Sequence, residues 1–403
     1  AYVDIILDKQ LTRNLIEISG DILNNARESG AEGKLLLDSA EQKIYDIRQG
    51  RDARGLVPIS DTLIEAYDRI NKLSGEDREQ YLGLKTGYSA VDAKLGGLNK
   101  SDLIILGARP GMGKTSFAMN IVENVALYSN KVCAVFSLEM PREQIVQRLL
   151  CSYANVSMAK ALRGQLSANE WKKLMLASDK LKKSKIFIDD SSRVTPAEIL
   201  SKCRRLKTTA GGVDLIMIDY IQLMSGGSST VAGSENRQQE IASITRDLKI
   251  MAKELNVPVI ALSQLKRIQS KEPQLSDLRE SGAIEQDADI VMFINRPEAI
   301  ATKEELESGK IVKGATDLII AKHRNGEQGR VQLRFIGEST KFVDVDEQNR
   351  SDEPPQYSSA PRYEEPPQNY EEDYGYGGPD YEEMYKTAAQ KNAAMEEEEP
   401  PFD

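Results

Sequence analysis

The feature that most limits what this chain can fold into is a glycine-rich segment, Ala108-Arg-Pro-Gly-Met-Gly-Lys114-Thr115. The apolar run LIILG precedes it and predicts a buried strand, and SFAMNIVENVAL follows it with helical composition. In a strand–loop–helix unit of this kind, small residues let backbone N–H groups curl around phosphate oxygens, and the helix N-terminus adds positive potential. The segment therefore predicts a phosphate-binding P-loop, in which Ala108 stands where the motif usually has its first glycine.

Short apolar runs alternate with helical patterns from Gly87 to about Gly337. Such alternation predicts an α/β domain with a mostly parallel sheet that helices cover on both faces. Ligands of these sheets bind at the carboxyl ends of the strands. The predicted strands are 103–107, 132–138, 186–188, 215–218, 259–262, 290–294 and 318–320.

Several predicted helices carry start signals. Thr195 with Glu198, and Ser167 with Glu170, have the spacing of capping boxes, and Pro196 occupies a first helical position. The segment 235–255 places a set of apolar residues on one helical face, namely Ile241, Ile244, Leu248, Met251 and Leu255.

The remaining segments divide the chain into four parts. Residues 1–50 look helical, and we expect them to be the remnant of a larger N-terminal domain. Residues 51–80 predict a linker followed by an amphipathic helix, capped by Ser60 and ended by Gly75, which packs either on its own domain or on a neighbouring subunit. The α/β domain is expected over 81–345, and a disordered acidic tail over 346–403.

Charge is distributed unevenly along the chain. Residues 344–403 carry 18 acidic and 4 basic side chains, whereas the rest carries 45 acidic and 49 basic ones, so the net charge of −10 belongs to the tail. The mildly basic body neither requires nor excludes nucleic acid. Solvated disorder is the simpler interpretation of the tail, and binding of a basic partner is the alternative.

Other residue types exclude several kinds of site. The chain has three scattered cysteines and a single histidine, His323, which argues against a zinc centre or a Ser-His-Asp hydrolase. The cysteines are interpreted as reduced thiols of a cytoplasmic protein. No run of about 20 apolar residues predicts a membrane span.

Polar residues end three of the predicted strands. Asp219 ends VDLIMID, as expected for a carboxylate that faces Mg²⁺ together with the Thr115 hydroxyl, and Lys114 is expected to bridge the β- and γ-phosphates. Glu139 ends VCAVFSLE and is a candidate to orient or deprotonate an attacking water. Gln264 ends PVIALSQ and is a candidate contact for the γ-phosphate. ATP and Mg²⁺ are therefore the expected cofactors.

Six blocks resemble, in order and spacing, the motifs of the DnaB replicative helicases. They are SLEM (137–140), LIMIDYIQLM (215–224), ENRQQEI (235–241), ALSQL (261–265), DLRESGAIEQDADIVMFI (277–294) and KHRNGEQG (322–329). The resemblance covers roughly residues 60–340 and implies a RecA-like ATPase domain that forms a hexameric ring with ATP between subunits. The acidic, tyrosine-rich tail is not part of the family pattern.

The resemblance also implies roles for particular residues. Glu139 matches the catalytic glutamate, Gln264 the γ-phosphate sensor, and Lys322 and Arg324 the cations that the next subunit donates in trans. His323 lies between those two and is interpreted as structural. The expected nucleotide contacts comprise Ala108, Arg109, Pro110, Gly111, Met112, Gly113, Lys114, Thr115, Ser116, Arg148, Gln264, Lys322, His323 and Arg324.

Two loops are expected to face single-stranded DNA in the ring. Arg279, Glu280 and Gly282 match a loop of the family that contacts the DNA backbone, and an arginine with exposed N–H groups can follow phosphates without reading bases. The Gly/Ser-rich segment 225–236 is the second loop, and Arg237 beside it is a weaker candidate.

By resemblance, the ring moves 5′ to 3′ on one DNA strand and excludes the other at the replication fork. The resemblance also implies primase, a helicase loader and the clamp-loader assembly as partners, and a nucleoid-associated location in the cytoplasm. Because primase contacts are expected in the N-terminal domain, the partial domain puts them in question.

Two other functions share the fold. A RecA/RadA-type recombinase would form filaments, and the ENRQQEI and RESGAIEQDAD blocks argue against it. An ATP-gated scaffold would hydrolyse ATP at a rate indifferent to DNA.

Overall fold

The computed structural model describes residues 2–28, 58–75, 78–226, 234–265, 272–278, 282–301 and 311–345, with isolated positions between 33 and 44 and at 304. The chain divides into two units, Ala1–Asn349 and Arg350–Asp403, and the second lies outside the described residues. The predictions for the tail therefore stay predictions. None of the described helices is long and apolar enough to cross a membrane.

Nine strands form one sheet in the order β3-β2-β4-β5-β1-β6-β7-β8-β9. The first six in this order are parallel, and β7, β8 and β9 add antiparallel strands at one edge. The strands are β1 Leu103–Ala108, β2 Cys133–Ser137, β3 Ile186–Asp189, β4 Leu215–Asp219, β5 Val259–Gln264, β6 Ile290–Asn295, β7 Ala315–His323, β8 Gly329–Ile336 and β9 Lys341–Asp344. The seven predicted strands are confirmed, whereas β8 and β9 had not been predicted.

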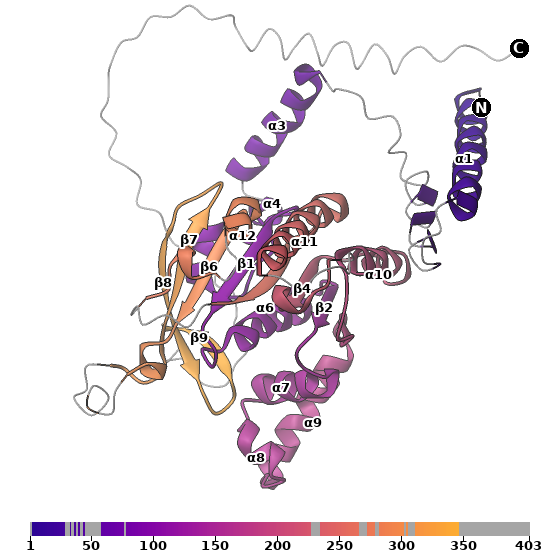
Figure 1. The fold of residues 1–403 in the computed structure, drawn as a ribbon. Coiled ribbons are helices and arrows are strands. Elements are labelled where there is room, and N and C mark those ends of the chain that lie inside the picture. The colour runs from indigo at the N-terminus through magenta and orange to yellow at the C-terminus, as the bar shows by residue number, and fades with distance from the viewer. Residues whose placement is uncertain are drawn as a thin grey trace, which may run out of the picture. The chain divides into compact units, whose positions relative to one another are not determined.

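Helices cover both faces of the sheet (Figure 1). They are α4 Arg78–Tyr81, α5 Ser89–Leu95, α6 Lys114–Tyr128, α7 Arg142–Ala154, α8 Met158–Leu162, α9 Ala168–Lys182, α10 Pro196–Thr209, α11 Ser234–Leu255 and α12 Gly282–Asp287, with short 3-10 turns at η2 Ile221–Leu223, η3 Leu275–Asp277 and η4 Pro297–Ala299. Two further helices precede them, α1 Tyr2–Glu28 and α3 Ile59–Ser74.

Alternate residues of β1 show why both faces need cover. Ile104 and Leu106 belong to a core with α5, α6 and α7, whereas Leu103 and Ile105 belong to a core with α10, α11 and α12. All four side chains are fully buried because successive side chains of a strand point to opposite faces. The apolar face predicted for 235–255 is confirmed, since its five residues are buried in the second core.

The cap predictions are confirmed in two helices and wrong in one. Both capping boxes form, Thr195 with Glu198 on α10 and Ser167 with Glu170 on α9. Helix α3 ends at Gly75 as predicted, but Pro58 rather than Ser60 precedes its first residue and no side chain caps it. The missing N–H group of proline does not destabilise a helix start, because the N–H groups there have no partner within the helix. The helix therefore begins two residues earlier than a Ser60 cap predicts.

Replacing Thr195 by alanine should lower the free energy of unfolding by about 1 kcal/mol, because the N–H of Glu198 would lose its acceptor. Urea denaturation of the whole chain measures this change. Thr209→Ala, at the other end of the same helix, is the control and should change stability by less. Equal losses in both variants would contradict the cap assignment.

The last strand, β9, closes the core beside α6. The N–H of Phe342 donates to Asn120 Oδ1 at 2.9 Å, and its ring lies 5.3 Å from that of Phe117. The hydroxyl and N–H of Ser89 donate to the Asp344 carboxylate at 2.8 Å. Strand β9 therefore joins the beginning and the end of the α/β domain, next to the helix that follows the P-loop.

Candidate active site

The P-loop connects β1 to α6, as the sequence predicts. Strand β1 ends at Ala108 and α6 begins at Lys114. Gly111 and Gly113 have φ angles of 79° and 90°, in the left-handed region that favours glycine. Of the other loop residues, Met112 and Ser116 are buried, Arg109 is half-buried and Pro110 is exposed. The loop thus turns tightly enough to present backbone N–H groups at the N-terminus of a 15-residue helix.

Sheet register brings the predicted polar residues to the same edge as this loop. Ser137 of β2 pairs with Asp219 of β4, and Ala108 of β1 pairs with Gln264 of β5. Glu139 follows two residues after Ser137 and is exposed. Since these strands are parallel, Asp219, Glu139 and Gln264 all lie at the carboxyl edge of the sheet.

Direct contacts join the P-loop to Asp219. The Thr115 hydroxyl donates to Asp219 Oδ2 at 2.7 Å, and Lys114 Nζ lies 3.6 Å from Asp219 Oδ1. Lys114 Nζ also lies 4.6 Å from the ring centroid of Tyr220. Asp219 is 1% exposed, and among the described residues its Oδ1 has the ion pair with Lys114 but no hydrogen-bond partner. A buried carboxylate oxygen without a hydrogen-bond donor destabilises the fold unless a bound ligand supplies the missing interaction.

Burial lowers the pKa of Lys114, and the charges of Asp219 and Glu139 oppose that change. The ammonium group therefore occupies a poorly solvated position near two carboxylates, that of Asp219 at the end of β4 and that of Glu139 just after β2. Electrostatic interactions with a phosphate are stronger in such a position than in water.

These residues fit a magnesium–triphosphate ligand. The hydroxyl of Thr115 and the carboxylate of Asp219 supply oxygen ligands of the kind that Mg²⁺ prefers, and Asp219 Oδ1 accepts no hydrogen bond from the described residues. Lys114 and the α6 N-terminus supply positive charge for phosphates. No atom lies within 4 Å of where a Cβ on Gly111 would be, so the loop has open space beside it. The described residues contain no cluster of three or more His, Cys, Asp or Glu side chains around a metal position.

Two further residues of this edge, Gln222 and Arg296, had not been predicted. Gln222 donates from Nε2 to the Ser263 hydroxyl at 2.9 Å and accepts from the N–H of Gln264 at 3.4 Å. Arg296 stacks 4.0 Å from the Phe335 ring centroid and donates to the Gly111 carbonyl at 3.4 Å. Arg296 directly follows β6, so the rule that strand ends carry the site could have found it.

Gly113→Ala should weaken nucleotide binding and lower the melting temperature, since a Cβ there would lie 2.9 Å from Phe342 and the φ of 90° is strained for alanine. Gly111→Ala is the matched control, because it has a similar φ but open space. Titration with a fluorescent ATP analogue measures the effect. Equally weak nucleotide binding in both variants would mean that the loss of affinity comes from backbone strain alone and not from the contact with Phe342.

Lys322 and Arg324 do not lie near this P-loop. His323 at the end of β7 pairs with Ile290 at the start of β6, and the Arg324 N–H donates to the Asp289 carbonyl. These residues are therefore at the amino edge of the sheet, separated from the P-loop by the length of β1, roughly 17 Å at 3.3 Å per residue. The cations cannot serve the nucleotide of their own subunit without a large movement.

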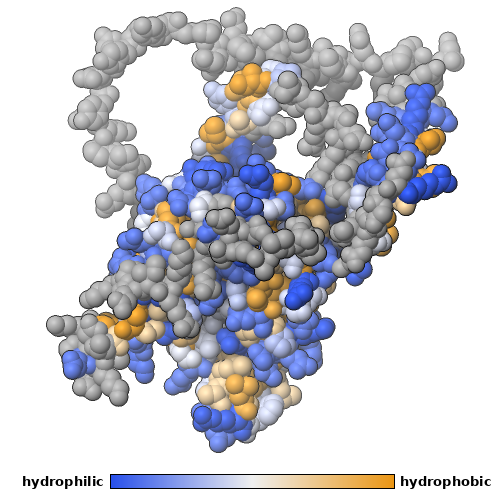
Figure 2. All heavy atoms as spheres, viewed as in Figure 1, coloured by the Kyte–Doolittle hydropathy of each residue, from blue (hydrophilic) through white to orange (hydrophobic). Residues whose placement is uncertain are grey.

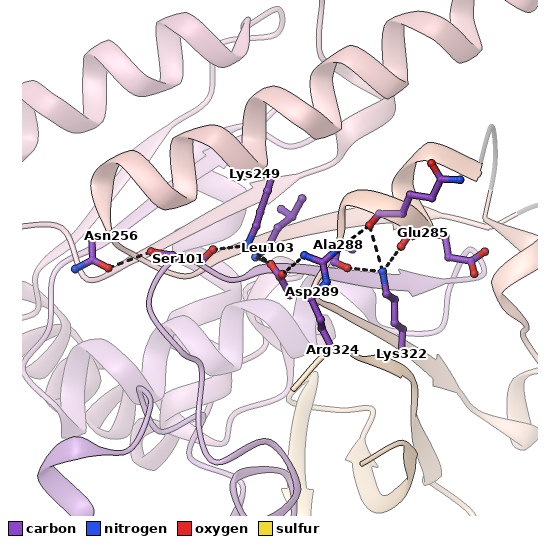
Figure 3. Close-up of polar contacts among 10 residues, drawn as sticks. Ser101, Leu103, Lys249, Asn256, Glu285, Ala288, Asp289, Lys322 and Arg324 are labelled. Atoms are coloured by element: carbon purple, nitrogen blue, oxygen red, sulfur yellow. Dashed lines mark hydrogen bonds and ion pairs between the residues drawn. The ribbon is translucent and has the colours of Figure 1, made fainter. Parts of the chain in front are cut away.

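At that edge the side chains of Lys322 and Arg324 are both held by hydrogen bonds (Figure 3). The Lys322 ammonium donates to the carbonyl groups of Glu285, Gln286 and Ala288 at the end of α12. The Arg324 guanidinium donates to Asp289 Oδ1 at 3.1 Å and remains half-exposed. His323 Nδ1 is buried and has no hydrogen-bond partner in the part of the chain that the structure describes.

The remaining predicted residues are placed only in part. Arg148 is half-buried on α7. Gly282 is exposed at the start of α12, whereas Arg279 and Glu280 lie outside the described residues. Arg237 forms an ion pair with Glu240 and donates to the Gln222 carbonyl at 2.6 Å, so it holds the segment after Asp219. Its contact with DNA, like those of the other three, stays a prediction.

The three cysteines Cys133, Cys151 and Cys203 are free and buried. Burial raises the pKa of each thiol, to about 12 for Cys203. The thiols therefore take no part in the chemistry of this edge.

The parallel sheet, the P-loop and the carboxylate facing it define a P-loop ATPase of the RecA-like class. The family described as DnaB-like helicase C terminal domain matches residues 83–344. The replicative DNA helicase DnaB of Haemophilus influenzae is 44% identical over 360 residues, 86% of this chain and 74% of that protein. The chain belongs to the DnaB-like replicative DNA helicases, and its activity is ATP-driven DNA unwinding.

Other relatives agree with this assignment. The replicative DNA helicase DnaB of Geobacillus stearothermophilus is 42% identical over 349 residues, 86% of this chain and 74% of its own. Among solved structures, one described as an ATPase domain superposes with a TM-score of 0.65 at 36% identity, over 72% of this chain and 100% of that one. A DnaB-like replicative helicase, described with its interactions with primase, superposes with a TM-score of 0.68 at 31% identity, over 85% of this chain and 78% of that one. The helicase assignment is favoured over the recombinase.

Proposed function

We propose that this chain forms a hexameric ring that hydrolyses ATP between subunits and moves 5′ to 3′ along single-stranded DNA. The observation that carries the proposal is the placement of its charges. The P-loop occupies the carboxyl edge of the sheet, whereas Lys322 and Arg324 occupy the amino edge. One subunit therefore has a nucleotide site at one edge and the cations to complete such a site at the other.

In this proposal the nucleotide phosphates are held by the P-loop N–H groups and Lys114, and Thr115 and Asp219 hold Mg²⁺. The metal supplies Lewis-acid polarisation of the phosphates. Glu139, exposed beside Lys114, orients the attacking water, and the Gln264 side chain contacts the γ-phosphate. Arg324 of the next subunit neutralises the charge that develops in the transition state, which makes hydrolysis depend on how two subunits are arranged.

Exposed apolar surfaces support assembly. Helix α3 exposes Ile59, Leu63, Ile64, Tyr67 and Ile70, and the α8–α9 region exposes Leu162, Trp171, Met175 and Leu176. Hydrophobic side chains are visible on the surface of both segments in Figure 2. Such patches are typical of protein interfaces. We propose that α3 docks on the α8–α9 region of a neighbouring subunit.

DNA passes through the ring in this proposal and meets the loop that precedes α12. Arg279, Glu280 and Gly282 contact its phosphates. Primase, a helicase loader and the clamp-loader assembly are proposed as partners. For primase, a related helicase has been described together with it.

Steady-state ATPase assays with and without oligo-dT, combined with strand displacement on a forked duplex, test the proposal. DNA-stimulated hydrolysis, unwinding and rings in electron microscopy are the expected results. Long filaments with ATP would instead favour a recombinase, and hydrolysis indifferent to DNA would favour a scaffold.

A further inference from the structure

We propose that Asp289 is a positioning residue that couples the DNA-facing loop to Lys322 and Arg324. This inference rests on the proposed function, because it assumes that the two cations act on the nucleotide of a neighbouring subunit. It goes beyond that function by naming the residue through which DNA at the beginning of the short helix α12 would act on Lys322 and Arg324.

Asp289 lies at the centre of the polar cluster at the amino edge of the sheet (Figure 3). Its side chain is 5% exposed and accepts from Lys249 of α11, from the N–H of Leu103 at 2.8 Å and from Arg324 at 3.1 Å. Both carboxylate oxygens are therefore bound. Buried charged groups with complete partners hold one geometry, since moving any partner exposes an uncompensated charge.

Helix α12 connects this cluster to the proposed DNA loop. It begins at Gly282, directly after residues 279–281, and ends at Asp287, two residues before Asp289. Its last carbonyl groups have no partner within a helix, and the Lys322 ammonium occupies them, at 2.5 Å from that of Glu285 and 2.7 Å from that of Ala288. Arg324 adds a bond to the Gln286 carbonyl at 3.3 Å.

Both cations are thus attached to the end of the helix whose beginning carries the DNA loop. Arg324 is the more accessible of the two, with 51% of its side chain exposed, so part of its guanidinium is available to a phosphate from another subunit. A displacement of α12 by DNA moves Lys322 through the three carbonyl groups and Arg324 through Asp289. Without the Asp289 carboxylate, Arg324 loses its ionic attachment to this edge, while the P-loop at the other edge is unchanged.

Asp289→Asn keeps the shape of the side chain and removes its charge. The expected result is a loss of coupling: the ratio of ATPase rates with and without oligo-dT should fall by at least about 5-fold, the lower end for coupled sites. The KM for ATP should stay near that of the wild type. By linkage, the change in oligo-dT affinity on adding a non-hydrolysable ATP analogue should shrink by a similar factor.

Lys249→Met is the matched control for stability. It removes the other cation on Asp289, also in a buried position, but leaves the contacts of Arg324 and Lys322 with α12 intact. Both variants should have lower melting temperatures, and only Asp289→Asn should lose coupling. If Asp289→Asn alone does not fold, the double variant Lys249→Met/Asp289→Asn avoids leaving a buried lone cation, and is compared with Lys249→Met.

The outcomes separate two kinds of failure. If the wild type shows no DNA stimulation, or if Arg324→Ala keeps it, the proposed function itself is wrong for these residues. If the wild type is stimulated and Arg324→Ala is not, but Asp289→Asn retains the stimulation and nucleotide-dependent DNA affinity of Lys249→Met, then Asp289 is purely structural and the inference is overturned.

Discussion

Replacing Arg324 by alanine should lower DNA-stimulated ATP hydrolysis by about 10³–10⁵-fold, the effect expected for an arginine supplied in trans. Binding of ATP should persist, because Lys114, Thr115 and Asp219 lie at the opposite edge of the sheet. Steady-state ATPase assays measure the rate, and titration of a fluorescent ATP analogue measures the binding.

Arg330→Ala is the matched control for this variant. Arg330 is on the next strand of the same hairpin and forms exposed ion pairs with Glu272 and Asp317, so its loss should change little. A reduction in Arg330→Ala as large as in Arg324→Ala would show that the hairpin as a whole, and not the Arg324 guanidinium, is required.

Lys114→Ala should have the other large effect and reduce hydrolysis by at least about 10²–10³-fold, as expected when a preorganised charge is removed from a buried site. Unlike Arg324→Ala, this variant should also bind nucleotide weakly, because Lys114 faces the phosphates from its own subunit. Lys131→Ala, which removes an exposed lysine paired with Asp214, is the control. Hydrolysis at the wild-type rate in Lys114→Ala would contradict the P-loop assignment.

Mixing the two inactive variants provides a further test of action in trans. An Arg324→Ala subunit keeps its P-loop, and a Lys114→Ala subunit keeps Arg324. In rings assembled from both, some interfaces combine the intact P-loop of one with the intact arginine of the other, so hydrolysis should return in part. Mixed assemblies that are as inactive as the separate variants would show that both residues must come from one subunit.

The sequence predicts the central sheet and the nucleotide edge well, for a physical reason. Strands buried on both faces appear as short, almost continuous apolar runs, and parallel strands bring their polar end residues to one edge. Asp219, Glu139 and Gln264 could therefore be found by reading where each run stops. The capping boxes at Thr195 and Ser167 were predictable because their hydrogen bonds are local.

The rest depends on interactions between distant segments. In β8 polar side chains alternate with buried ones, and β9 is only four residues long with one buried residue, so neither strand forms an apolar run that the sequence pattern would reveal. The antiparallel direction of β7, which puts Lys322 and Arg324 at the far edge, cannot be read from its apolar run. Tyr220, Gln222 and Arg296 contact the site through tertiary packing, although Tyr220 and Arg296 directly follow the strands β4 and β6.

The position of Phe342 has a consequence for how the protein is made. Its ring packs beside Gly113 and Phe117, and its backbone binds Asn120 on the helix that follows the P-loop. During synthesis the P-loop leaves the ribosome long before strand β9 does. A nascent chain that has not reached Phe342 therefore lacks the buried ring that packs against the P-loop glycine Gly113, and ATP can stabilise the domain fully only after that strand has been added.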